Sequence, residues 1–392
     1  MKFFDEADRM RFGIFMGPYH KPGLNPTLAF EQDLNTIVNL DTWGYDEVWI
    51  GEHHSGGIET IASPELMIAA AAERTKRIKL GTGVASLPYH HPFMVAERIV
   101  QLDHMTKGRA MMGVGPGQIV KDNIMIGGDP MKTRPRLQEA MDAVMRLFRG
   151  ETVTMKTDWF ELVEAEMQLL PYSNFDVAVV SVISPSGPIL AGRYGAGLIS
   201  VAATDPVGIE KLAGHWEIWK AEAEKAGEVA DRQQWRMMGP MHLAETFEQA
   251  KEDVRHGLSI IEDYRAHINP APPTDYFDID MIVDAFNESG AAVIGTPEMA
   301  RAQIDRLIEK SGGFGTYLLM GVDWASYPAT ERSHQLFAEE VIPHFNGSLA
   351  PMTRSFEDVI GTGYSGAEIT DTAQKAFTAD YEKSGGRVPA KV

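Results

Sequence analysis

Short apolar runs alternate with longer amphipathic stretches along most of the chain. The apolar runs span residues 11–16, 47–50, 78–84, 109–114, 177–182, 198–201, 235–243 and 315–320. The stretches with helical periodicity include residues 28–43, 64–74, 92–105, 134–148, 206–227 and 331–342. Repeated strand–helix units of this kind predict a parallel sheet. Eight strands favour a closed (β/α)₈ barrel, the TIM-barrel architecture, over an open sheet.

Three segments exceed a minimal barrel. Residues 150–172 are typical of a β-hairpin, and residues 247–294 form a long insertion. The middle of this insertion, residues 269–275, contains three prolines and is predicted to lack regular structure. Long loops of this kind often cover a site or bind a ligand. We therefore expect one barrel domain over residues 1–347, followed by a polar, Gly-rich extension over residues 348–392. That extension is either an arm on a partner subunit or a mobile tail.

Charge and composition narrow the class of protein. The 392-residue chain has a net charge of −19 and no cysteine. The charge opposes binding to nucleic acid or to an anionic membrane. The lack of cysteine excludes disulfides, thiolate metal sites and a cysteine nucleophile. The N-terminal segment has no signal-peptide pattern, and no apolar run is long enough to span a membrane. We expect a soluble, cytoplasmic protein.

The segment Glu52-His53-His54 directly follows the apolar run 47–50. It is therefore expected at the carboxyl end of a barrel strand, where barrel enzymes carry their chemistry. Histidine is also suited to proton transfer near neutral pH. Adjacent strand side chains point to opposite faces, so His53 and His54 should not ligate one metal. His53 is the candidate functional residue, whereas for His54 a structural role is equally compatible.

Other positions suit a flat or anionic ligand. Glycines at the end of the run 78–84 allow close backbone approach, although an ordinary strand exit would use them too. Arg109 begins an apolar strand, where either a phosphate or a structural ion pair could neutralise it. Ser184, Ser186 and Gly187 precede a predicted helix, whose N-terminus can bind an anion or be capped by a serine. The glycines of residues 113–117 do not form a dinucleotide fingerprint.

Four segments in order resemble the bacterial luciferase-like flavin monooxygenases. They are residues 49–54, 81–84, 102–109 and 295–298, and the resemblance extends over residues 11–345. Residues 20–23, 88–92 and 184–188 are most similar to limonene monooxygenase-type members of that family. The resemblance implies a barrel that binds FMN, used as FMNH₂ supplied by a separate flavin reductase, and a homodimer.

The resemblance also implies roles for individual residues. His53 matches the catalytic histidine, and Gly83–Val84 matches a non-proline cis peptide that supports the flavin ring. Arg109 matches a phosphate-binding arginine, and Ser184 and Ser186 match the hydroxyls of the phosphate loop. The predicted cofactor-binding residues are Glu52, Gly83, Val84, Arg109, Ser184, Ser186 and Gly187. No metal site is predicted.

The implied reaction is oxygenation of a small, largely apolar compound such as a terpene, cyclic ketone or heterocycle, using O₂ through a flavin hydroperoxide. His53 would control protonation or act as a base, and the 247–294 insertion would exclude water. The predicted substrate-pocket residues are His20, Tyr89, Asp323 and Trp324. Three alternatives remain open: a deazaflavin-dependent hydride-transfer enzyme, a non-catalytic flavin-binding protein, and a metal-dependent hydrolase. The hydrolase would use Glu52, His53, His54, His90 and His91.

Overall fold

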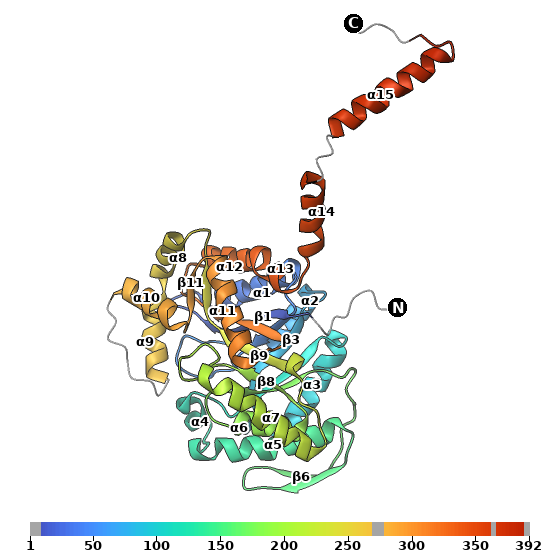
Figure 1. Cartoon of the computed structure of the whole chain (residues 1–392). Helices are drawn as coiled ribbons and strands as arrows, with labels where there is room; N and C mark the ends of the chain where they lie inside the picture. The colour runs from blue at the N-terminus through green and yellow to red at the C-terminus, as the bar shows by residue number, and fades with distance from the viewer. Residues whose placement is uncertain (1–8, 269–277, 362–365, 388–392) are drawn as a thin grey trace. The chain divides into compact units, whose positions relative to one another are not determined.

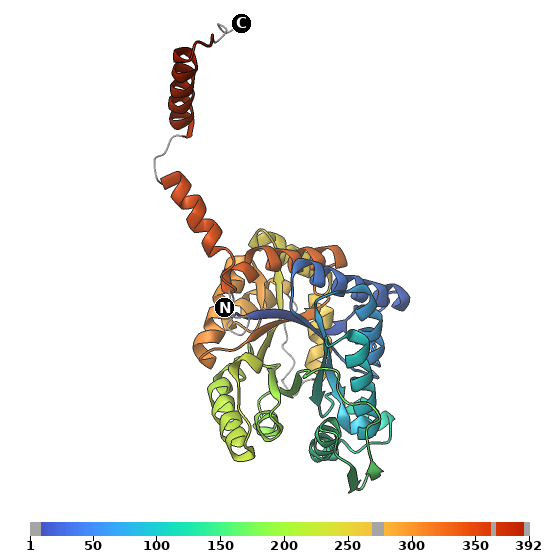
Figure 2. The same ribbon diagram turned by 90° about the vertical axis from the view of Figure 1, so that its right-hand side faces the viewer.

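The computed structural model describes residues 9–268, 278–361 and 366–387 and contains a closed barrel of eight parallel strands (Figures 1 and 2). In spatial order the barrel strands are β1, β12, β9, β8, β7, β4, β3 and β2. Their bounds are β1 Arg11–Tyr19, β2 Glu47–Ile50, β3 Lys79–Ser86, β4 Ala110–Gly115, β7 Val177–Ser181, β8 Gly197–Ser200, β9 Trp235–Gly239 and β12 Thr316–Val322. The predicted (β/α)₈ barrel is confirmed.

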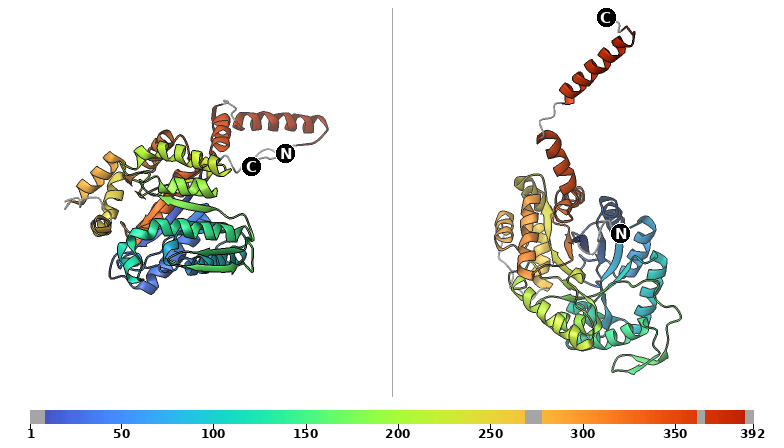
Figure 3. Two further views of the ribbon diagram at one scale, coloured as in Figure 1. Left: turned by 90° about the horizontal axis from the view of Figure 1, so that it is seen from below. Right: turned by 45° about the vertical axis from the view of Figure 1, so that its right-hand side comes forward.

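Helices surround this barrel on its outer side, as both views of Figure 3 show. They are α1 Pro26–Trp43, α2 Pro64–Arg74, α3 Pro92–Thr106, α4 Val120–Met125, α5 Thr133–Phe148, α6 Ser186–Tyr194, α7 Leu212–Ala226, α11 Pro297–Ser311, α12 Tyr327–Glu340 and α13 Ile342–Phe345. Local sequence sets their ends. In α1, the Asn25 side chain accepts hydrogen bonds from the first free backbone amides, and Gly44 ends the helix at φ 88°.

The strand side chains divide between two buried clusters. Outward-pointing residues such as Ile14 pack beneath the helices, and inward-pointing residues such as Trp49 fill the barrel. A buried ion cluster lies where the strands begin. There the Arg236 guanidinium contacts Glu47 at 3.0 Å and Asp176 at 2.7 Å, and it also lies over the Trp49 ring. Charged groups thus occupy the amino-terminal end of the barrel, opposite the end to which β2 delivers Glu52-His53-His54.

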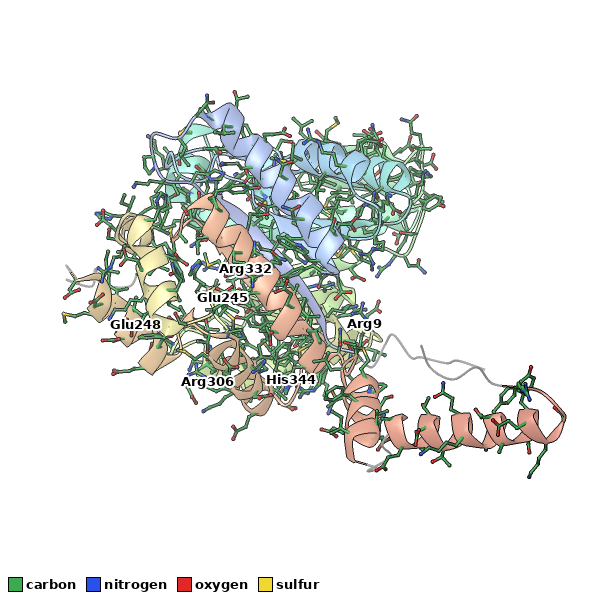
Figure 4. The ribbon with its side chains drawn as sticks, turned by 90° about the horizontal axis from the view of Figure 1, so that it is seen from above. Arg9, Glu245, Glu248, Arg306, Arg332 and His344 are labelled. Atoms are coloured by element: carbon green, nitrogen blue, oxygen red, sulfur yellow. The ribbon has the colours of Figure 1, made fainter. Side chains whose placement is uncertain are left out.

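The predicted seventh strand, residues 235–243, is wrong in its second half. The barrel strand β9 ends at Gly239, and after Pro240 the short strand β10 (Met241–Leu243) pairs outside the barrel with β11 (Val293–Gly295). Proline has no N–H group and so cannot continue the hydrogen-bonded ladder. Figure 4 shows Arg332 of α12 beside Glu245, which follows β10; the two form a 2.8 Å ion pair.

The two predicted insertions take different forms. Residues 150–172 contain the antiparallel pair β5 (Val153–Lys156) and β6 (Glu161–Ala165), which confirms the hairpin. The 247–294 insertion carries the helices α8 Phe247–Asp253, α9 Leu258–Ile268 and α10 Ile279–Ser289, visible at one side of the barrel in Figure 1. The irregular stretch predicted at residues 269–275 lies outside the described residues.

The chain separates into two compact units, Met1–Phe345 and Asn346–Val392. The first unit holds the barrel and both buried clusters. The second contains α14 (Ala350–Gly361) and α15 (Gly366–Lys383), and within the described residues neither helix has a buried side chain. Among the helices of the described ranges, none combines the length and apolar character needed to cross a membrane.

Candidate active site

His53 lies just beyond β2, between two carboxylates. Its Nε2 is 3.1 Å from an oxygen of Glu59, and its Nδ1 is 3.3 Å from an oxygen of Asp122. Burial lowers the pKa of His53, but hydrogen bonds to Asp122 and Glu59 outweigh this effect and raise that pKa to about 9. His53 is therefore an imidazolium at neutral pH and donates from both ring nitrogens. This arrangement suits proton donation or stabilisation of negative charge better than a base.

Glu52 anchors a second cluster on the other side of His53. One of its oxygens is 3.0 Å from His54 Nε2 and 2.6 Å from His90 Nε2, and the other accepts the Ser86 amide at 2.7 Å. Burial raises the pKa of Glu52, but these hydrogen bonds lower that pKa by more than burial raises it. The net result is a pKa of about 2. Glu52 is 4% exposed and clamps the loops after β2 and β3 together.

The two adjacent histidines diverge as expected. His53 joins the Glu59 and Asp122 carboxylates, whereas His54 turns to Glu52. In the part of the chain that the structure describes, no group of three or more His, Asp or Glu side chains has the geometry to hold a metal ion. The side chains of His53 and His54 are held by carboxylates of the protein.

The peptide bond Gly83–Val84 in β3 is cis, which confirms that prediction. A Cβ atom on Gly83 would lie 2.8 Å from the Cβ of Trp49 and 2.9 Å from its carbonyl carbon. Glycine is therefore required at this position for β3 to pack against β2. The bond lies in the carboxyl half of β3 and the His53 segment follows β2, its parallel neighbour, so both lie toward the same end of the barrel.

Hydroxyl groups gather where β7 leads into α6. Ser184 and Ser186 are exposed, with their oxygens 2.8 Å apart, and the buried Ser181 hydroxyl has no hydrogen-bond partner among the described residues. Gly187 lets α6 pack closely, because a Cβ there would lie 2.7 Å from the Ser181 Cβ. Pro185 occupies the cap position of α6, so no serine caps this helix. The hydroxyls and helix N-terminus have the donors that a phosphate monoester needs.

Arg109 does not lie with these groups, and its position counts against the predicted phosphate-binding role. It precedes β4, at the amino-terminal end of the barrel, and donates to Ala72 O and Thr75 Oγ1 at 2.9 Å and to Ile78 O at 3.2 Å. Its guanidinium therefore satisfies oxygen acceptors at the end of α2 and in the following loop. The contacts favour the alternative that Arg109 has a structural role. Its partners, however, are backbone carbonyls and a hydroxyl, and not the carboxylate of an ion pair.

The four predicted substrate-pocket residues lie in three different environments. His20 contacts Asp323 at 2.8 Å and Asp33 of α1 at 3.1 Å, and these residues border a cavity of about 170 Å³ between the barrel wall and the outer helices. Tyr89 instead lies beside His54, with ring centroids 6.1 Å apart. Trp324 is 1% exposed, stacks on Phe286 and donates to Glu262. His20 points outward because it follows the inward-facing Tyr19.

Sequence reasoning missed the partners of His53. Glu59 belongs to an irregular loop, and Asp122 lies in α4, 69 residues from His53 along the chain. Neither follows an apolar run that would mark it as the end of a strand. Tyr264, from α9 of the insertion, was also missed, although it lies against Gly56 in the loop between His53 and Glu59. The one sequence-based indication of Tyr264 was the expectation that the 247–294 insertion covers a site.

A family model described as luciferase-like monooxygenase matches residues 10–313, and the chain belongs to that family. The chain is 50% identical to limonene 1,2-monooxygenase of Rhodococcus erythropolis, a match that covers 96% of this chain and 97% of that protein. It is 43% identical to 4-hydroxyprotoasukamycin monooxygenase of Streptomyces nodosus subsp. asukaensis, over 89% and 96% of the two chains. Both relatives are monooxygenases.

A solved relative shares the fold. The oxygenating constituent of 3,6-diketocamphane monooxygenase from Pseudomonas putida, a type II Baeyer–Villiger monooxygenase in complex with FMN, matches with a TM-score of 0.70 and 26% identity. The match covers 86% of this chain and 98% of that chain. Together with the monooxygenase relatives, these findings make the chain a flavin-dependent monooxygenase.

Proposed function

We propose that this protein is an FMNH₂-dependent oxygenase component that adds one oxygen atom from O₂ to a small, largely apolar organic compound. The observation that carries the proposal is the charged His53, held by Glu59 and Asp122 at the carboxyl end of the barrel. A fixed proton donor there suits a reaction in which negative charge develops on oxygen. The two carboxylates keep the imidazole protonated at neutral pH.

The residues of this chain fit FMN in two places. Ser184 and Ser186, with the N-terminus of α6, would hold the phosphate, and the buried Ser181 hydroxyl at the end of β7 has no partner among the described residues. The cis peptide Gly83–Val84 would lie under the ring. When bound, the reduced flavin supplies the electrons and the reaction with O₂. The protein contributes binding, orientation, exclusion of water and the proton held at His53 Nε2 or Nδ1.

One feature supports a separate reductase as the electron donor, and another supports an apolar substrate. The solved relative is named as the oxygenating constituent of its enzyme, which supports a separate reductase as the source of FMNH₂ here. Side chains near the carboxyl ends of the barrel strands are apolar and only partly buried, among them Phe15, Val180 and Val201. An apolar barrel mouth, together with the limonene monooxygenase relative, favours a terpene-like substrate.

The test supplies FMNH₂ from a separate NADH-dependent flavin reductase, with limonene and ¹⁸O₂ in the reaction. We expect one labelled oxygen atom in the product. We expect His53→Asn to keep its FMN affinity and to lose at least about 100-fold in product formation while releasing H₂O₂. Normal turnover by His53→Asn would contradict the role of His53. Failure to bind reduced FMN, combined with binding of reduced deazaflavin F420, would replace the proposal with hydride transfer.

A further inference from the structure

Helix α9 of the insertion brings Tyr264 to the His53 centre. Its ring meets Tyr19 edge-on, with centroids 6.2 Å apart. Its hydroxyl lies against Gly56, where a Cβ atom would be only 2.4 Å away. Gly56 also has φ 90°, a conformation that favours glycine. The loop between His53 and Glu59 is therefore shaped to receive this hydroxyl.

The two carboxylates on His53 are not equally satisfied. Asp122 accepts from His53 with one oxygen and from the Ser55 hydroxyl with the other. Glu59 accepts from His53 Nε2 with one oxygen, while its Oε1 is buried and has no hydrogen-bond partner within the described ranges. A buried carboxylate oxygen without a donor is costly, so a donor from a neighbouring group is expected for Glu59 Oε1.

Tyr264 carries a hydrogen-bond donor that complements the acceptor Glu59 Oε1. Its hydroxyl is buried and, like Glu59 Oε1, lacks a partner among the residues described. Burial and the nearby charges of Glu59 and Asp122 all raise the pKa of Tyr264, which keeps the phenol protonated and able to donate. A donor and an acceptor without partners among the described residues thus belong to neighbouring segments, one on the insertion and one on the loop after β2.

We propose that Tyr264 is a positioning residue of the His53 centre: its hydroxyl, which is not bonded to Glu59 in this structure, turns to donate to Glu59 Oε1 and thereby holds Glu59 on His53 Nε2. The inference rests on the proposed role of His53. It makes the insertion part of the centre, because one hydrogen bond connects α9 to the group that holds the proton. Tyr264 acts through Glu59 and needs no contact with flavin or substrate.

The test observes His53 directly in flavin-free protein. In protein labelled with ¹⁵N-histidine, the Nε2–H and Nδ1–H signals of His53 are assigned by their loss in His53→Asn. In Tyr264→Phe, which keeps the ring, we expect Nε2–H to exchange with water about fivefold faster or more, because its acceptor loosens. The Nδ1–H signal, on Asp122, should be unchanged and serves as an internal control. Tyr45→Phe, which removes a buried hydroxyl bonded to His334 O, should change neither signal.

Equal exchange in Tyr264→Phe and the wild type, or equal changes at both ring nitrogens, would overturn the inference. A second measurement uses Glu59→Gln: adding Tyr264→Phe to that variant should change nothing further, and additive effects would count against a pathway through Glu59. If Tyr264→Phe does not fold, 3-fluorotyrosine at position 264, a stronger donor, should slow Nε2–H exchange; no change would overturn the inference. Because flavin is absent, loss of oxygenation in the wild type would refute only the proposed function.

Discussion

The histidines that matter most in this molecule are defined by their carboxylate partners. His20 and His53 each lie between two carboxylates, and each is held in its charged form at neutral pH. Hydrogen bonds to Asp323 and Asp33 outweigh the effect of burial and raise the pKa of His20 to about 10. The arrangement of one histidine between two carboxylates thus occurs at two places in the fold. His20 faces the outer helices, and His53 faces the carboxyl end of the barrel.

The raised pKa of His20 predicts a pH-dependent contribution to stability. A histidine whose pKa is higher in the folded state stabilises fully below its unfolded value of 6.5, and this contribution is lost as the pH rises through about 10. The free energy of unfolding of the wild type minus that of His20→Gln should therefore shrink by a few kcal/mol, to order of magnitude, between pH 6 and pH 10. Urea unfolding of both proteins across this range measures it; a constant difference would contradict the assignment.

Arg109 is predicted to stabilise the fold without binding cofactor. Arg109→Ala removes donors from three acceptors near the end of α2 and should lower the free energy of unfolding by about 2 kcal/mol. FMN affinity should stay within about twofold, since the guanidinium lies at the opposite end of the barrel. Urea unfolding and an FMN titration test the two parts separately. Weakened FMN binding at unchanged stability would restore the phosphate-binding interpretation.

At the scale of elements, the sequence predicts what is local. The bounds of β2 and α2 agree with their predicted ranges, because apolar runs, prolines and turn residues mark them. The end of β9 was missed because a three-residue strand after Pro240 continues the apolar run in sequence while leaving the barrel in space. Glu59, Asp122 and Tyr264 could not be predicted, because only the closure of the barrel brings their three segments together. For Arg109, a charge at the start of a strand is equally compatible with phosphate and with backbone carbonyls.

The N-terminus of α6 allows a prediction at this scale. Removing both hydroxyls with Ser184→Ala/Ser186→Ala should weaken FMN binding roughly tenfold, because each hydroxyl offers a hydrogen bond to a charged phosphate at an exposed position. Riboflavin, which has no phosphate, is the matched control ligand, and its affinity should not change. Fluorescence titration with both ligands makes the comparison. An equal loss for both would place the phosphate elsewhere.

At the scale of the whole molecule, the barrel unit has its own hydrophobic core. Both buried clusters belong to Met1–Phe345, whereas the described part of Asn346–Val392 has helices with no buried side chain. Apolar residues such as Phe356 and Phe377 are exposed on those helices. The described structure therefore changes from packed to unpacked where the first unit ends, at Phe345.

A chain ending at residue 347 is accordingly predicted to fold. Its melting temperature should lie within about 3 °C of the full-length value, because the truncation removes no buried side chain of the described helices. Calorimetry of both proteins measures the difference, and light scattering shows whether the truncation changes the number of subunits. A fall of more than about 10 °C would mean that the second unit stabilises the barrel.

The ion cluster around Arg236 has a consequence for the kinetics of the enzyme. Arg236, Glu47 and Asp176 occupy the amino-terminal end and side chains such as Trp49 fill the interior, so ligands can reach the barrel only at its carboxyl end. Flavin, organic substrate and product are therefore expected to enter and leave at that end, so whichever lies deepest would bind first and leave last. An obligatory order of binding and release would then follow from having one open end.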